Sequence, residues 1–231
     1  WLPIFPAANL ADNYRVAWRE TNRYLLNTIY VAFVSIAGGL ITISLAAYAF
    51  ARFNFPWRDV LFSILMLLMM IPVILQLIPS FMWVKRLGLY NTYWALILPY
   101  IAAGQAWSVY VLRSFFASLP QELFEAAKID GAGDFRIYYQ VALPLCKGIL
   151  STLAILRFVE VWNDLIWPLI ITVDKAHRTI TVGLYSFQGA YQTQYGAMFA
   201  GYTIASLPML LLFALFMRQF MSGITSGAIK T

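Results

Sequence analysis

Three charged residues within an otherwise apolar segment are the first candidates for chemistry in this sequence. Arg157, Glu160 and Asp164 follow one another at spacings of three and four residues, so an α-helix places them on one narrow stripe. An unpaired charge inside a bilayer costs at least about 2.5 kcal/mol, which favours an internal Arg157–Glu160 ion pair or a contact with another subunit. The stripe could line a transport path, hold a gate closed or join neighbouring helices. We prefer the last, structural role.

Motifs for other kinds of chemistry are absent from the sequence. It contains no G-x-x-x-x-G-K-[ST] phosphate-binding loop, so we expect that this chain does not hydrolyse ATP. The single His177 excludes a zinc helix of the H-E-x-x-H kind, and the single Cys146 cannot form an internal disulfide. We therefore predict that the chain is not an enzyme and has no catalytic residue, metal or cofactor of its own.

The composition is that of a membrane protein. Of the 231 residues, 61% are hydrophobic and only 11% are charged, whereas a soluble domain has about 25% charged residues. Four runs contain no acidic or basic residue, and each reaches the roughly 20 residues that cross a bilayer core: residues 24–51, 60–84, 87–112 and 179–217. The basic residues are dispersed among these runs and form no continuous face for nucleic acid.

The lengths of these runs predict an all-α transmembrane bundle of five spans. Residues 179–195 are rich in Thr, Gln, Tyr, Ser and Gly, so we predict a loop there and a final helix over residues 196–220. Residues 145–173 are apolar apart from Lys147 and the charged stripe, and they cross if the charges face protein or water. Lys and Arg are almost evenly divided between the two sides, so charge alone does not fix the orientation.

A polar loop, residues 113–144, connects two of the spans and contains a predicted short helix. Pro120 favours a helix start, residues 121–129 are good helix formers, and Asp130-Gly131 ends the helix because glycine accepts a left-handed backbone. The small side chains of Ala126 and Ala127 would let the helix press closely against a partner, and Glu125 could pair with basic groups there. The alternative is a connector that lies on the membrane surface.

This loop resembles the EAA loop of ABC importer permeases. Glu125-Ala126-Ala127 is followed by Gly131 and then by Val141-Ala142-Leu143-Pro144, with Val141 where the family usually has Ile. The resemblance implies a type I permease fold with a cytoplasmic coupling loop. It also implies which residues couple the chain to an ATPase: Glu125, Ala126, Ala127, Asp130, Gly131 and Pro144. The family usually has six spans, so we expect a first helix ahead of this sequence.

Motifs along nearly the whole chain are similar to the carbohydrate-importer branch, and in particular to the smaller permease subunit of the maltose type. They include Asn27-Thr28, the segment from Ala46 to Arg52, Trp162-Asn163-Asp164 and the tail from Ser222 to Lys230. The resemblance implies a prokaryotic cytoplasmic membrane and a second, different permease subunit. It also implies two ATPase subunits that bind ATP and Mg, and an extracytoplasmic sugar-binding protein. In the tail, Gly227 and Lys230 would contact the ATPase, although the common final glycine is missing here.

These expectations divide the chain into a lead-in over residues 1–25, a transmembrane domain over 26–221 and a cytoplasmic tail over 222–231. Residues 10–23 of the lead-in could form an amphipathic helix at the membrane surface or an ordinary connector. Polar residues within the spans are candidates for the sugar pathway or its gate: Gln76, Gln105, Ser108, Asn163 and Asp164.

Prolines within or beside the spans could bend the helices around a central path: Pro72, Pro79, Pro99, Pro168 and Pro208. The leading alternative to an ATP-driven importer is an ion-coupled secondary transporter or channel, in which the charged stripe would carry ions or protons. A secondary transporter usually shows internal repeats with discontinuous helices, and none is visible in this sequence.

Overall fold

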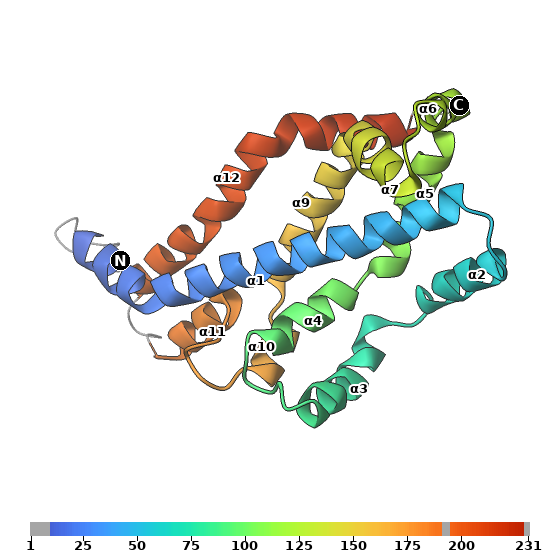
Figure 1. Cartoon of the computed structure of the whole chain (residues 1–231). Coiled ribbons are helices and arrows are strands. Elements are labelled where there is room, and N and C mark those ends of the chain that lie inside the picture. The colour runs from blue at the N-terminus through green and yellow to red at the C-terminus, as the bar shows by residue number, and fades with distance from the viewer. Residues whose placement is uncertain (1–9, 191–194, 229–231) are drawn as a thin grey trace. The chain divides into compact units, whose positions relative to one another are not determined.

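The computed structural model describes residues 10–190 and 195–228, and all regular structure within them is helical (Figure 1). The first five helices are α1 (Leu10–Arg52), α2 (Arg58–Leu68), α3 (Val73–Arg86), α4 (Trp94–Ala102) and α5 (Gln105–Ser118). The polar loop contains α6 (Gln121–Ile129), α7 (Asp134–Ile137), the π-helical turn η2 (Tyr138–Ala142) and α8 (Leu143–Leu145). The last four helices are α9 (Lys147–Asn163), α10 (Ile166–Ile171), α11 (Ile180–Ala190) and α12 (Tyr195–Ala228).

The predicted five spans agree with the lengths of these helices. Within the described residues, two helices, Leu10–Arg52 and Tyr195–Phe216, are long and apolar enough to cross a membrane by themselves. Three helix pairs, each bent at a short break, are long and apolar enough when taken together: α2 with α3 by 101°, α4 with α5 by 45°, and Asp134–Leu145 with α9 by 76°. Counting each bent pair as one span gives up to five.

The breaks between the paired helices have local causes. Pro72, which has no backbone N–H to donate, lies between α2 and α3. Gly104, between α4 and α5, has a φ of 59°, which glycine adopts at little cost. Pro79, Pro99, Pro168 and Pro208, in contrast, lie inside continuous helices. Only one of the five prolines therefore coincides with a break between two long helices.

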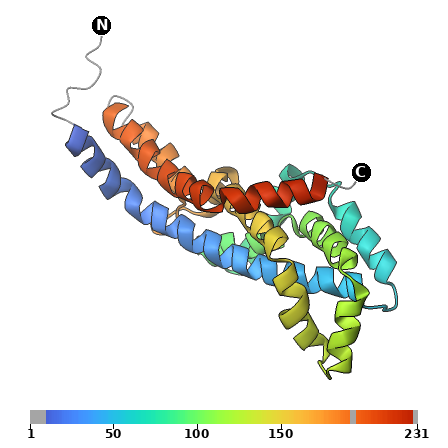
Figure 2. The same cartoon turned by 90° about the horizontal axis from the view of Figure 1, so that it is seen from above.

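The chain is divided into two compact units, which we describe separately. The first comprises residues 1–35, 80–99 and 157–217, and the second comprises residues 36–79, 100–156 and 218–231. In the first unit, the beginnings of α1 and α12 lie side by side (Figures 1 and 2), where Ala17 packs with Ala200 and Ile204. In the second unit, the end of α1 packs against α5 and the polar loop around Tyr48, Phe116 and Phe124.

The lead-in is part of a single long helix from Leu10 onward. α1 has 43 residues, a length of about 65 Å at 1.5 Å per residue. Ala17, Thr21 and Tyr24 are buried on this stretch, and the Thr21 hydroxyl donates a 2.7 Å hydrogen bond to the carbonyl of Ala17. The buried face of α1 thus continues into residues 10–25, which the sequence had indicated as part of a separate lead-in.

The loop predicted for residues 179–195 was wrong for residues 180–190, which form α11. Thr28 explains its start, because its hydroxyl oxygen accepts a 2.7 Å hydrogen bond from the N–H of Ile180. Ile180 and Leu184 are buried in a cluster with Tyr24, Leu25, Trp162 and Ala205. Burial of these side chains against distant helices outweighs the local preference of a segment rich in Thr, Ser and Gly.

We predict that Gly183 in α11 is required for this packing. A Cβ on Gly183 would overlap the ring of the buried Tyr24. Gly183→Ala should therefore destabilise the protein by roughly 1–3 kcal/mol, measured as a lower midpoint of thermal unfolding in detergent. Gly148→Ala in α9 is the matched control, because a Cβ there meets nothing within 4 Å. Equal midpoints for the two variants would contradict the packing of α11 against α1.

Candidate functional site

The short helix of the polar loop begins and ends where the sequence predicts. α6 covers Gln121–Ile129, with Pro120 before it and Asp130 after it. The N–H of Gly131 donates to the carbonyl of Lys128 at 3.0 Å, and the N–H of Ala132 donates to that of Ala127 at 2.9 Å. This is a Schellman ending, which needs a left-handed residue, and Gly131 has a φ of 76°.

One face of α6 is buried and the other is exposed. Phe124 is the only buried residue of this helix and belongs to the core of the second unit. Glu125, Ala126, Asp130 and Gly131 are exposed, and Ala127 is half-buried. Five of the six coupling residues expected from the resemblance therefore lie together on α6 and its terminal turn. Pro144 lies apart from them, exposed in α8.

Large apolar side chains of the polar loop are also exposed. Ile129 is 86% exposed and Phe135 is 73% exposed, and Leu123 and Tyr139 are also exposed. Exposed apolar side chains that gather beside small and acidic residues are typical of a protein-binding surface. No pattern in the sequence indicated them, although Ile129 directly precedes Asp130 and Phe135 follows Gly131 by four residues.

Arg52, at the end of α1, fixes the position of α6. Its Nη2 donates to the carbonyl oxygens of Phe116 at 2.6 Å and Leu119 at 2.9 Å, and its Nη1 donates to Oε1 of Gln121 at 2.9 Å. Its guanidinium carbon lies 3.7 Å from the centre of the Phe124 ring. One side chain thus joins α1 to the end of α5 and to the beginning of α6.

The chemistry of a helix end explains why an arginine occupies this position. The last four carbonyls of an α-helix have no intrahelical partner, and Phe116 and Leu119 lie at the end of α5. A cation there satisfies these carbonyls and interacts favourably with the negative end of the helix dipole. In the sequence, Arg52 stands out only as the last residue of the segment from Ala46 to Arg52 that is similar to carbohydrate importers. The available signal was a single arginine directly after a long apolar run.

The segment after α6 is held to α1 by a second set of contacts. Tyr138 in η2 is buried, and its hydroxyl lies 2.7 Å from Oγ of Ser44. The Tyr138 ring also packs on Tyr48, with 5.2 Å between ring centres. α6 is therefore anchored before it by Arg52 and after it by Tyr138, while its exposed face remains available.

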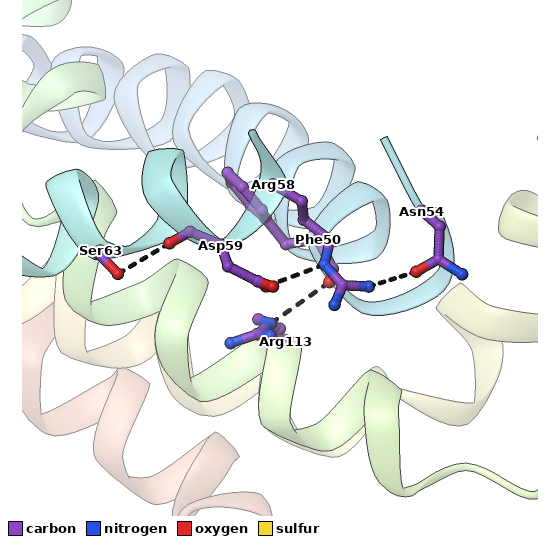
Figure 3. A network of polar contacts seen from close by, with 6 residues as sticks. All are labelled: Phe50, Asn54, Arg58, Asp59, Ser63 and Arg113. Carbon is purple, nitrogen blue, oxygen red and sulfur yellow. Dashed lines mark hydrogen bonds and ion pairs between the residues drawn. The ribbon is translucent and has the colours of Figure 1, made fainter. Parts of the chain in front are cut away.

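A polar network stabilises the neighbouring turn between α1 and α2 (Figure 3). Arg58 donates to Oδ1 of Asn54 at 2.6 Å and to Oδ1 of Asp59 at 3.1 Å. Arg113 in α5 donates to the carbonyl of Phe50 at 3.4 Å and lies 3.9 Å over the ring of Phe62. Arg113 thus connects α5 with both α1 and α2, close in sequence to the carbonyls that Arg52 binds.

The charged stripe is divided between two roles. Nη1 of Arg157 lies 2.8 Å from Oε2 of Glu160, and 14% of the Arg157 side chain is exposed against 63% of the Glu160 side chain. Asp164 faces the next helix instead, where its Oδ1 accepts a 3.3 Å hydrogen bond from the N–H of Trp167 in α10. The structure therefore contains the pair expected from the spacing, and Asp164 caps the beginning of a helix.

The candidate pathway residues are divided between the two units. Gln76, Gln105 and Ser108 belong to the second unit. There Nε2 of Gln105 donates to Oγ1 of Thr42 at 2.9 Å, whereas Ser108 is only 1% exposed. Asn163 belongs to the first unit, where it lines a cavity. Of the two tail residues, Gly227 lies within α12, and Lys230 lies outside the described residues.

Comparisons with known proteins agree on one family. Residues 38–225 match the family described as "Binding-protein-dependent transport system inner membrane component". The diacetylchitobiose uptake system permease protein NgcG of Streptomyces coelicolor is 33% identical over 95% of this chain and 74% of its own length. The trehalose transport system permease protein SugB of Mycobacterium tuberculosis is 34% identical over 98% of this chain and 84% of its own length.

A solved structure shares the fold. A chain of a bacterial ABC transporter that imports the acidic polysaccharide alginate matches with a TM-score of 0.79 and 23% identity, over 90% of this chain and 79% of that chain. The match establishes the same helical arrangement as an importer permease. Together, the family and its relatives favour an importer over an ion-coupled secondary transporter or channel.

We predict that Arg52 controls the stability of the coupling segment, which is the polar loop of residues 113–144 that contains α6. Arg52→Ala would leave the carbonyls of Phe116 and Leu119 without their charged donor, at a cost of roughly 1.5–3 kcal/mol per bond. Amide hydrogen exchange over residues 119–132 should then become at least tenfold faster. Arg136→Ala is the matched control, since Arg136 bonds only to the exposed Gln140 one turn away. Unchanged protection in Arg52→Ala would show that the contacts do not hold the segment.

The unequal exposure of the ion pair predicts unequal effects of its two deletions. Glu160→Leu leaves a largely buried guanidinium without its carboxylate, at a cost of roughly 3 kcal/mol. Arg157→Met leaves a carboxylate that reaches the surface of the unit, at about 1 kcal/mol or less. The double variant should regain most of the stability lost in Glu160→Leu, measured by thermal unfolding and recovery of the assembled complex. Equal losses in both single variants, or no recovery in the double variant, would contradict a structural lock.

Proposed function

This chain belongs to the family of binding-protein-dependent transport system inner membrane components, and we propose that α6 is its docking site for an ATPase in a saccharide importer. It is a multi-pass subunit of the inner membrane, and its family consists of transport subunits. The observation that carries the proposal is the exposed face of α6, Glu125 and Ala126, on a helix whose opposite face is fixed by Phe124 and Arg52.

The exposed surface of α6 suits a socket in another protein. Ala126 and the half-buried Ala127 let the helix backbone approach a partner closely, and Ile129 and Phe135 supply apolar area to bury. Glu125 and Asp130 are available for basic groups of the partner. We assign this partner as one of two ATPase subunits, which would bind the ATP and Mg that this chain has no loop to hold.

Movement of the ATPase would reach the membrane through the contacts of Arg52. When the ATPase subunits close on ATP, the docked α6 moves with them, and Arg52 carries the displacement to the end of α1 and to α5. A packed, hydrogen-bonded joint transmits displacement because it has few alternative arrangements. Tyr138 restrains the segment after α6 in the same way. The chain thus acts as a lever and catalyses no reaction.

The substrate class follows from the relatives. The names of NgcG and SugB specify diacetylchitobiose and trehalose, which supports a saccharide as the cargo of this chain. A second, different permease subunit and an extracytoplasmic sugar-binding protein complete the proposed importer. The Arg157–Glu160 pair supports this proposal over ion coupling, because both charges already have a partner.

The proposal is tested by uptake into vesicles that contain the complete importer. With ATP inside and no ion gradient, the vesicles should accumulate radiolabelled trehalose or diacetylchitobiose. Gly131→Val should abolish most of this uptake, because a β-branched residue at a φ of 76° costs on the order of 1 kcal/mol or more and displaces the end of α6. ATP hydrolysis should continue without transport, or the ATPase should dissociate.

Gly133→Val is the matched control for this experiment. Gly133 lies two residues further on, has a φ of −70° and leaves open space around an added Cβ. It should therefore transport at nearly the normal rate. Normal transport by Gly131→Val would refute the assignment of α6. Uptake that needs a proton or sodium gradient and survives removal of the ATPase would refute the whole proposal.

A further inference from the structure

The first unit contains a cavity of about 540 Å³ that the coupling mechanism does not use. α9, α11 and α12 contribute its walls. Its volume lies in the range of small-molecule sites, which are about 300–1,000 Å³. The side chains that give it chemical character are three aromatic residues, one amide and two aliphatic hydroxyl groups: Trp162, Asn163, Thr181, Tyr185, Tyr202 and Ser206.

We propose that this cavity is a subsite for one ring of an uncharged saccharide on its way through the importer. A sugar ring presents C–H groups on its faces and hydroxyl groups around its edge. Tyr185 and Tyr202 offer aromatic surface for the faces, and Asn163 and Ser206 offer polar atoms for the hydroxyls. The inference rests on the proposed function and adds a substrate site on this chain.

Asn163 and Ser206 can accept hydrogen bonds from the hydroxyl groups of a sugar. The Nδ2 of Asn163 donates to the carbonyl of Val159 at 2.9 Å, while its Oδ1 accepts no hydrogen bond from the described residues. The hydroxyl of Ser206 donates to the carbonyl of Thr203 at 2.8 Å and can still accept. An apolar occupant, such as a lipid chain, would leave these acceptors without a donor.

The wall behind the site is held rigidly. Trp162 is 4% exposed and stacks on Phe158, with 5.1 Å between ring centres and 23° between planes. The hydroxyl of Thr181 donates a 2.7 Å hydrogen bond to the carbonyl of Trp162, which ties α11 to the end of α9. A wall fixed before binding reduces the entropy lost when a ligand is bound.

The side chains that line the cavity also favour uncharged sugars over charged ones. All of the residues around the cavity are uncharged. A carboxylate or phosphate on the sugar would therefore lose water without gaining a cation, which is costly. We infer that the site accepts neutral saccharides and excludes acidic ones. Asn163 ends α9, whereas Lys147 at the beginning of α9 directly follows the coupling segment. The site thus belongs to the end of the span that faces the arriving sugar.

The test uses the reconstituted importer with its sugar-binding protein. Tyr185→Ala and Asn163→Ala should lower uptake of radiolabelled trehalose or diacetylchitobiose by about three- to tenfold, with unchanged assembly and unchanged ATP hydrolysis stimulated by the binding protein. Tyr195→Ala is the matched control, because Tyr195 is 58% exposed against 57% for Tyr185 and does not line the cavity.

A second measurement reports occupancy directly. Tyr185→Cys can be labelled selectively with a maleimide, since the chain's own Cys146 is fully buried. The transported neutral sugar should slow this labelling in the assembled importer, and an alginate oligosaccharide should not.

Each outcome of these experiments has a definite meaning. Unchanged uptake in Tyr185→Ala and Asn163→Ala, or labelling that neutral sugar does not slow, would overturn the subsite. Loss of the sister permease from Tyr185→Ala would also overturn it, because the cavity would then be a contact between subunits. Absence of uptake by the unmodified importer would instead count against the proposed function.

Discussion

The arrangement of the coupling segment depends on the interaction of Arg52 with the end of α5. Phe116 and Leu119 present carbonyl oxygens at the end of α5, where the regular helical hydrogen bonds stop, and the guanidinium fork of Arg52 binds both. Because the same group contacts Gln121 and lies over Phe124, it also fixes the start of α6. A lysine could supply the charge, but its single ammonium could not make this set of planar contacts. The end of α1 thereby fixes the position of the polar loop.

Fixing one face of α6 leaves its opposite face to a partner. A free 9-residue helix would be only marginally stable in water, so the anchoring by Phe124 and the Schellman ending at Gly131 are what keep it helical. The exposed face combines small residues with apolar ones such as Ile129. Close backbone approach and buried apolar area act together in a docking surface, and rigidity beneath it lets a displacement reach α1 and α5. The exposed face and the rigid base of α6 therefore suit the docking role that we propose for it.

The polar side chains of the two units make different kinds of contact. In the second unit, arginines and aromatic rings join helix ends, as Arg113 does with Phe50 and Phe62. In the first unit, polar groups lie along the helices: the Arg157–Glu160 pair balances its own charge, and Thr28 and Asp164 cap neighbouring helices. Beside the cavity, Oδ1 of Asn163 accepts no hydrogen bond from the described residues. Unpaired polar atoms in a membrane subunit suit a polar occupant.

The sequence by itself determined the features that depend on neighbouring residues. Apolar runs predicted the all-α class and the five spans, and Pro120, Asp130 and Gly131 predicted the bounds of α6, because helix starts and left-handed turns are properties of a few adjacent residues. The contacts of Arg52 could not be predicted, since its partners are more than 60 residues away. α11 was mistaken for a loop for the same reason: its polar composition is local, but the burial of Ile180 and Leu184 against Tyr24 is not. Tertiary packing alone decided these contacts and the cavity, because each requires side chains from distant helices to meet.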